Sequence, residues 1–193
     1  NFKFLKQYLT LNRAELFFAE KAIFIEGETE RILLPAMMKK TDQIDPSNPL
    51  LSQNISIIEV GAYSHIFEKF IDFIGLKKGL IITDIDSYYL SPDMEADGVT
   101  QKTYENGNPK FIEIKCAASD ANAQYTRNSS LKFFHKNNTA NSSDINYYNN
   151  LKLDWKILRK KKHKGWVSNR KANLLICYQT KEDNYTPRSF EDA

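Results

Sequence analysis

The stretch that most constrains the fold of this chain is KAIFIEGETE, at residues 21–30. Residues 22–25 form a short apolar run, Glu26-Gly27 interrupts it, and residues 29–38 carry apolar side chains at helical spacing. This pattern predicts a strand, a tight turn and a helix. In open α/β sheets, ligands collect beyond the carboxyl ends of the strands, so we expect Glu26 at the working edge of a sheet.

A second acidic group follows another strand-like run. Residues 79–83 read GLIIT, which is typical of a buried strand, and Asp84-Ile85-Asp86 comes next. On an extended chain, residues two apart point to the same side, so the two aspartates are expected to face one way. They meet Glu26 only if the two strands are neighbours.

The order of the elements predicts an α/β fold with a mostly parallel sheet and flanking helices. Residues 55–60 form a further predicted strand, and a helix capped by Ser64 and ending near Gly75 precedes the strand at 79–83. Strands that alternate with helices over so short a length indicate right-handed βαβ units. Pro35 is expected to kink the first helix or to limit it.

The pattern changes after the third strand, where a long insertion is expected at about residues 88–170. Within it, residues 111–117 alternate like a strand and residues 129–135 could form a short helix. Residues 172–179 form a late strand that could rejoin the main sheet. Residues 187–193 have the composition of a helix start, with Ser189 as the N-cap.

Composition favours a soluble, cytoplasmic protein. At 193 residues, with 41% hydrophobic and 26% charged residues, the chain has the composition of a globular domain. It has no apolar run near the roughly 18 residues that cross a membrane, and two cysteines fit a reducing compartment. A first residue other than Met and an abrupt last segment suggest a piece of a larger protein.

A basic segment at residues 152–171 interleaves lysines and arginines with Trp155, His163 and Trp166. Such a segment could hold phosphates and stack on bases, and a solvated surface segment is an almost equally good interpretation. The residues expected to contact DNA are Lys160, Lys161, Lys162, Lys164 and Arg170.

The carboxylates have a chemical use if they gather at one edge of the sheet. Hard oxygen ligands hold Mg²⁺ or Mn²⁺, and a pair of ions about 4 Å apart can stabilise both the attacking and the leaving oxygen of a phosphodiester. Glu30 could turn back toward Glu26 from the first turn of the helix, or it could simply favour the helix N-terminus.

Together, E-G-x-x-E at Glu26–Glu30 and D-x-D at Asp84–Asp86 resemble the Toprim domain of topoisomerases, bacterial primases and the nucleases of the OLD (overcoming lysogenization defect) family. The flanking segments at residues 17–21, 58–61, 178–179 and 188–193 resemble the nuclease half of OLD proteins, including the anti-phage nucleases of the Gabija type. The resemblance spans roughly residues 14–193. It implies a Rossmann-like Toprim nuclease domain at residues 21–193, truncated at its C-terminal end, after an arm at residues 1–20.

The resemblance also implies roles for individual residues. Glu26 would be the acid/base or a metal ligand, Glu30 would support metal binding, and Asp84 with Asp86 would hold the ion. A further carboxylate would come from RSFED. Asp192 is favoured because it follows Ser189 by three residues, as in the family's S-x-x-E pattern, and Glu191 is the alternative.

The function implied is a divalent-metal-dependent DNA endonuclease or nickase that belongs to a larger, oligomeric ATPase-nuclease. The chain contains no G-x-x-x-x-G-K-[ST], so the ATPase half would lie elsewhere, and the family's later lysine is expected beyond Ala193. Two alternatives remain open: a Toprim fold used only for DNA binding or assembly, and a different α/β domain acting on small phosphate esters.

Overall fold

The computed structural model describes residues 19–68, 71, 76, 78–138, 141–161 and 165–192, which form two compact units. Unit 1 holds the described residues up to Asp84 together with Asn128–Ser142 and Leu151–Tyr178. Unit 2 holds Ile85–Arg127, Ser143–Asn150 and the described residues from Gln179 onward. The arm expected at residues 1–20 lies almost entirely outside the described residues.

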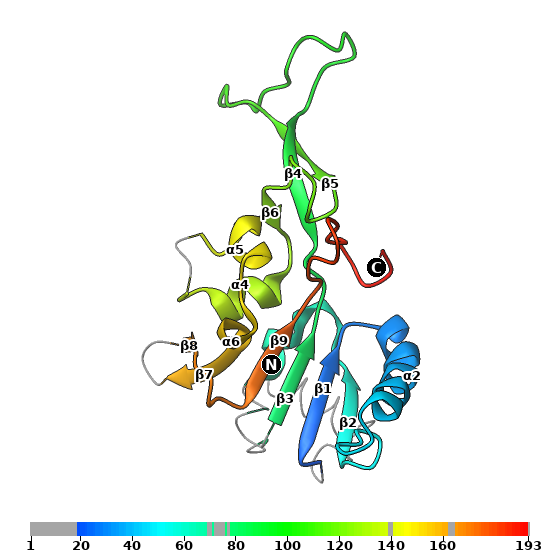
Figure 1. Ribbon diagram of the computed structural model, residues 1–193. Helices are drawn as coiled ribbons and strands as arrows, with labels where there is room; N and C mark the ends of the chain where they lie inside the picture. Colours follow the sequence, from blue (N-terminus) through cyan, green and yellow to red (C-terminus); the bar gives the residue numbers. More distant parts are fainter. Residues whose placement is uncertain are drawn as a thin grey trace. The chain divides into compact units, whose positions relative to one another are not determined.

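Unit 1 is built on a six-stranded sheet (Figure 1). Its strands, in spatial order, are β2 (Ile55–Glu59), β1 (Lys21–Ile25), β3 (Lys78–Ile82), β9 (Leu174–Cys177), β7 (Ile157–Lys161) and β8 (Gly165–Ser168). The first four are parallel to one another, and β7 and β8 are added in antiparallel pairings. The predicted α/β fold with a mostly parallel sheet is confirmed.

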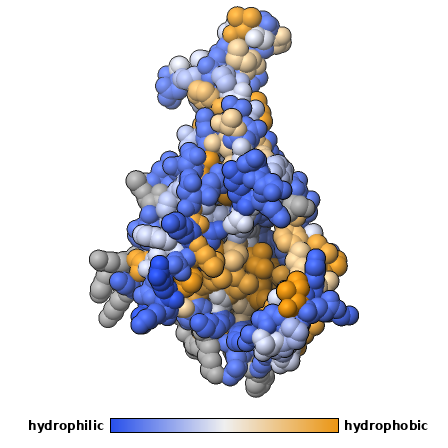
Figure 2. Space-filling view, in the orientation of Figure 1, coloured by the Kyte–Doolittle hydropathy of each residue, from blue (hydrophilic) through white to orange (hydrophobic). Residues whose placement is uncertain are grey.

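Strand β1 is a continuous apolar run because side chains on both of its faces are buried. Phe24, Ile58 and Ile81 are fully buried toward one face, whereas Ile23 and Ile25 pack toward the other. Figure 2 shows apolar side chains gathered over β1, β3 and β9 beside the helix α2, where the lining of a hollow includes Ile23, Leu80 and Leu175.

The helix α2 (Glu28–Ile44) covers one face of the sheet with its buried residues Leu34 and Met38, which pack against Ile23 and Ile25. Pro35 lies inside this helix and does not limit it. Proline removes the backbone donor that would bond the carbonyl four residues earlier, but both Pro35 and Arg31 are exposed residues, so water can reach this part of the helix. Of the two effects expected of Pro35, a kink or an early end of the helix, the early end is therefore wrong.

Shorter helices contribute to the rest of unit 1: the 3₁₀-helix η2 (Gly61–Phe67), α4 (Ser129–His135) and α6 (Leu153–Lys156). The helix expected at residues 129–135 is confirmed. Ser64, in contrast, lies inside η2 and is buried, so it is not the N-cap that the sequence predicts. Gly75 and most of the remainder of that predicted helix lie outside the described residues.

Unit 2 contains a three-stranded antiparallel sheet in the order β5 (Phe111–Lys115), β4 (Ser87–Pro92) and β6 (Tyr125–Thr126). A short helix, α5 (Ile145–Asn149), belongs to the same unit. Residues 188–192 form bends and a turn, so the predicted helix start at Ser189 is not present in the described part. Strand β4 was not predicted, because its polar and aromatic residues show no clear alternation.

The segment predicted as an insertion at about residues 88–170 is divided between the two units. Residues 157–161 join the main sheet, where Ile157 and Leu158 pair with Leu175 and Leu174 of β9. The late strand does rejoin that sheet, beside β3, as expected. No helix in the described part of the chain has the length and apolar character needed to span a membrane.

Candidate active site

Two acidic residues of unit 1 follow neighbouring parallel strands. Glu26 comes directly after β1, and Asp84 comes two residues after β3. The strands pair in register, with Phe24 opposite Ile81, so their carboxyl ends lie at the same edge of the sheet. The sequence analysis expects Glu26 and Asp84 to meet only if their strands are neighbours. Strands β1 and β3 are neighbours, so this condition is met.

The carboxylate of Glu26 is tied to the end of β3. Its Oε1 accepts hydrogen bonds from the backbone N–H of Asp84 at 3.2 Å and from the hydroxyl of Thr83. Thr83 is 1% exposed, so this bond is shielded from water. A carboxylate that bridges two strand ends in this way has a defined orientation, which metal binding requires.

Asn128 also contacts Glu26, Thr83 and Asp84, and the sequence analysis did not identify it as a site residue. Its side-chain Nδ2 lies 3.1 Å from Oε1 of Glu26, 2.7 Å from the Thr83 hydroxyl and 2.7 Å from the Asp84 carbonyl oxygen. Its Oδ1 accepts the backbone N–H of Leu131 and so caps α4. An asparagine before a predicted helix was the one available signal, and it indicates a cap rather than a site.

Glu30 belongs to the first turn of α2 and is buried, at 2% exposure. Its Oε2 accepts the backbone N–H of Gly27 at 3.1 Å, which satisfies a donor that the helix N-terminus leaves open. The structure thus places Glu30 in the helix-terminus role that was its alternative interpretation. Glu28 beside it is exposed and pairs with Arg31 at 3.1 Å.

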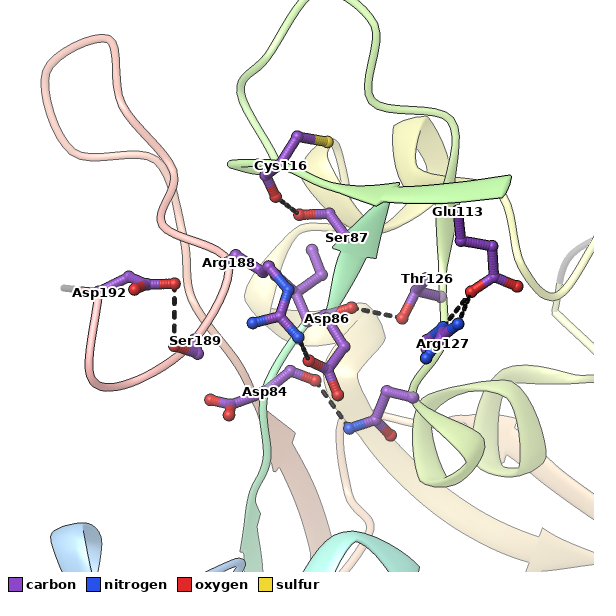
Figure 3. A network of polar contacts seen from close by, with 12 residues as sticks. Asp84, Asp86, Ser87, Glu113, Cys116, Thr126, Arg127, Arg188, Ser189 and Asp192 are labelled. Atoms are coloured by element: carbon purple, nitrogen blue, oxygen red, sulfur yellow. Dashed lines mark hydrogen bonds and ion pairs between the residues drawn. The ribbon is translucent and has the colours of Figure 1, made fainter. Parts of the chain in front are cut away.

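Asp86 lies in unit 2, where Arg188 holds it. The Arg188 guanidinium donates to Oδ1 of Asp86 at 2.6 Å (Figure 3). Asp86 has φ of 50°, a left-handed conformation that aspartate tolerates better than most residues. The chain is therefore not extended at this point, and the expected alternation that put Asp84 and Asp86 on one side does not apply.

The last acidic segment is also in unit 2. The hydroxyl of Ser189 donates to Oδ2 of Asp192 at 3.0 Å, and the backbone N–H of Asp192 donates to the Ser189 carbonyl (Figure 3). Glu191 and Asp192 are both exposed. Exposure therefore does not indicate which of the two carboxylates is the better candidate ligand. Only Asp192 has the contact with Ser189 that the S-x-x-E pattern places there.

The predicted ligands are divided between the two units. Within the described ranges, no three His, Cys, Asp or Glu side chains are close enough together to hold an ion. Glu26, Glu30 and Asp84 belong to unit 1, whereas Asp86, Glu191 and Asp192 belong to unit 2. The chemistry of the donor set nevertheless suits a hard divalent cation, because the carboxylates supply only oxygen.

Within the basic segment at residues 152–171, strands β7 and β8 pair with each other in antiparallel orientation. Lys160 pairs with Glu68 at 3.0 Å, and Glu68 also accepts the indole N–H of Trp166. Arg170 pairs with Asp154 at 2.7 Å, and Lys161 is exposed. Lys162 and Lys164 lie outside the described residues.

Two comparisons with known proteins show what this chain is similar to. Residues 17–86 match the family model described as "Overcoming lysogenization defect protein-like, TOPRIM domain". The chain is 28% identical over 192 residues to "Endonuclease GajA" of Bacillus cereus (strain HuB5-5), an alignment that covers 99% of this chain and 21% of the relative. It thus spans about a fifth of the length of that curated relative, and no solved structure matches it significantly. Over residues 17–86, the chain is thus similar to a Toprim domain of the OLD-like type.

Proposed function

We propose that this Toprim domain is a divalent-metal-dependent DNA endonuclease or nickase that hydrolyses phosphodiester bonds. The observation that carries the proposal is the pair of carboxylate residues, Glu26 and Asp84, at the ends of adjacent parallel strands, linked by the 3.2 Å hydrogen bond from the Asp84 N–H. The match of residues 17–86 to the OLD-like Toprim family supports it. The relative's name, an endonuclease, points the same way.

In this proposal, Glu26 and Asp84 supply oxygen ligands from the edge of the unit 1 sheet. Bound Mg²⁺ or Mn²⁺, with two ions expected, would lower the pKa of a bound water and neutralise the phosphate. Glu26 would also be the group that accepts a proton from that water. Asp86, Glu191 and Asp192 remain proposed ligands from unit 2, and Glu30 remains a proposed supporting ligand.

The proposed DNA contacts are the cations of the basic segment: Lys160, Lys161, Lys162, Lys164 and Arg170. The ion pair of Arg170 with Asp154 is exposed and contributes little free energy, so Arg170 can exchange Asp154 for a phosphate. Lys160 is itself partly exposed, although its partner Glu68 is mostly buried. We further propose that the natural protein is longer, cytoplasmic and homo-oligomeric, carries an ATPase half outside this chain, and acts in anti-phage defence.

A nicking assay on supercoiled plasmid tests the proposal, with Mg²⁺, Mn²⁺ or EDTA. It is run on this chain and on the longer natural protein that we propose contains it. Glu26→Gln and Asp84→Asn are expected to abolish metal-dependent nicking and to leave the circular dichroism spectrum unchanged. Glu28→Gln is the matched control, because Glu28 is an exposed acid two residues from Glu26. Parental nicking by either variant would refute the assignment.

A second candidate is a Toprim fold used for DNA binding or assembly without catalysis. Two observations favour it. The carboxylate of Asp86 is already paired with Arg188, and the carboxylate of Glu30 already accepts the Gly27 N–H. A binding module would hold DNA equally well before and after chelation. Absence of nicking, together with plasmid binding that EDTA does not change, would therefore select this candidate.

A further inference from the structure

Asn128 is a buried amide that contacts both strand ends of the unit 1 site. The residue is 3% exposed, and its Nδ2 lies within 3.1 Å of acceptors on Glu26, Thr83 and Asp84. The amide has two N–H groups, so three acceptors share two hydrogens. Such contacts are costly to lose, because a buried acceptor without its donor carries its full desolvation penalty.

The hydrogen bond at Oδ1 of Asn128 determines which way the side-chain amide is oriented. Oδ1 of Asn128 accepts the N–H of Leu131 at 2.9 Å. A flipped amide would aim its NH₂ group at that N–H and its oxygen at the carbonyl of Asp84, which would pair donor with donor and acceptor with acceptor. The NH₂ group therefore points at Glu26.

Capping alone does not require an asparagine. Helix α4 needs only an acceptor at its N-cap, and serine or threonine supplies one. The NH₂ group adds something that a hydroxyl cap does not: a donor that reaches the carboxylate of Glu26 while the same side chain caps α4. One residue thus joins the cap of α4 to the ends of β1 and β3.

We propose that Asn128 is a positioning residue for the active site, which holds the Glu26 carboxylate in the orientation that binds the divalent ion. The inference rests on the proposed function, since it assigns Asn128 a role in the same metal site. Residues that orient a metal ligand typically change metal affinity by about 10- to 100-fold when they are removed. The amide acts through Glu26 and does not itself contact the ion.

The test uses the Asn128→Ser variant of this chain, which keeps a helix cap and removes the NH₂ group. Mn²⁺ affinity is measured by electron paramagnetic resonance of the free ion, and thermal stability is measured on the same samples. The matched control is Ser130→Ala, which removes a fully buried donor from the same helix, bonded at 3.2 Å to the carbonyl of Ala62. If Asn128→Ser does not fold, Asn128→Thr repeats the test with a larger capping residue.

The expected result is Mn²⁺ binding about 10-fold weaker in Asn128→Ser, with Ser130→Ala within about twofold of the parent whatever its melting temperature. Nicking by Asn128→Ser should recover when Mn²⁺ is raised about 10-fold, whereas Glu26→Gln should not recover. Parental Mn²⁺ affinity in Asn128→Ser would overturn the inference and leave the proposed function intact. A parent chain that binds no Mn²⁺ would overturn the metal site and this inference together.

Discussion

The guanidinium of Arg188 lies 2.6 Å from Oδ1 of Asp86, and the backbones of the two residues are bonded as well, with the Asp86 N–H donating to the Arg188 carbonyl at 3.0 Å. The two residues are 102 positions apart in the chain. A proposed metal ligand is therefore already paired with a cation of the protein. Any divalent ion at Asp86 has to compete with that guanidinium for the carboxylate.

Replacing Arg188 by glutamine should tighten Mn²⁺ binding several-fold, because the variant lacks a positive charge that repels the ion and occupies Oδ1 of Asp86. The free energy of unfolding should fall by about 1 kcal/mol, since the pair is only partly shielded from water. Calorimetric titration with Mn²⁺ measures the first effect. Arg127→Gln, which breaks the pair with Glu113 in the same unit, is the control. Unchanged Mn²⁺ affinity in Arg188→Gln would count against Asp86 as a ligand.

His135 makes stability depend on pH. Burial, and then the charge of Lys156, lower the pKa of His135 from its ordinary 6.5 to about 4 in the folded chain. Between these values the unfolded chain binds more protons, so the stabilising effect is complete above pH 6.5 and is lost as the pH falls to 4. Urea unfolding at pH 7 and pH 4 should differ by up to about 3 kcal/mol from this group. His135→Leu should reduce that difference, and an identical pH profile would contradict the assignment.

Lys156 is buried, with its Nζ 3.7 Å from the centroid of the Tyr178 ring, and burial lowers its pKa. Lys156→Met keeps most of the side-chain volume and removes the buried charge. We expect the free energy of unfolding to change by less than about 1 kcal/mol, because the loss of the cation–π contact offsets the relief of desolvation.

The same substitution should raise the pKa of His135, since the charge of Lys156 lowers it. The loss of stability on acidification should then begin at the same pH and be smaller. Urea titrations of parent and variant across pH 4 to 7 measure this, with Lys161→Met as the control for an exposed lysine. A larger acid loss in Lys156→Met would contradict the coupling.

Pro35→Ala should stabilise the protein. Pro35 is exposed within α2, so the substitution removes little packing and restores a backbone donor to the helix. Proline in a helix interior is unfavourable by about 3 kcal/mol relative to alanine, and we expect a gain of about 1 to 3 kcal/mol in the free energy of unfolding. Thermal melts measure it, with Ala36→Gly as a comparison expected to destabilise by about 1 kcal/mol. A lower melting temperature for Pro35→Ala would show that the helix depends on the proline geometry.

Local hydrophobic patterns in the sequence are sufficient to predict much of the fold. The apolar runs before Glu26 and Asp84 are strands, and the short helix at Ser129–His135 has the predicted bounds. Ser64 shows the limit of that reasoning, because a capping residue was inferred where the chain forms a 3₁₀-helix with the serine buried inside it. The N-cap is the residue just before the first residue of a helix, and hydrophobic periodicity locates that first residue poorly.

The α/β class, the strands that precede Glu26 and Asp84, and the Toprim resemblance all follow from the sequence alone, because they depend on the hydrophobic pattern of neighbouring residues and on short motifs. Three features become visible only in the folded chain: Asn128 contacts Glu26, Arg188 pairs with Asp86, and strands β7 and β8 of the basic segment extend the main sheet. The first two contacts each join residues 102 positions apart. Such pairings arise from the packing of whole elements, so no local pattern along the chain encodes them.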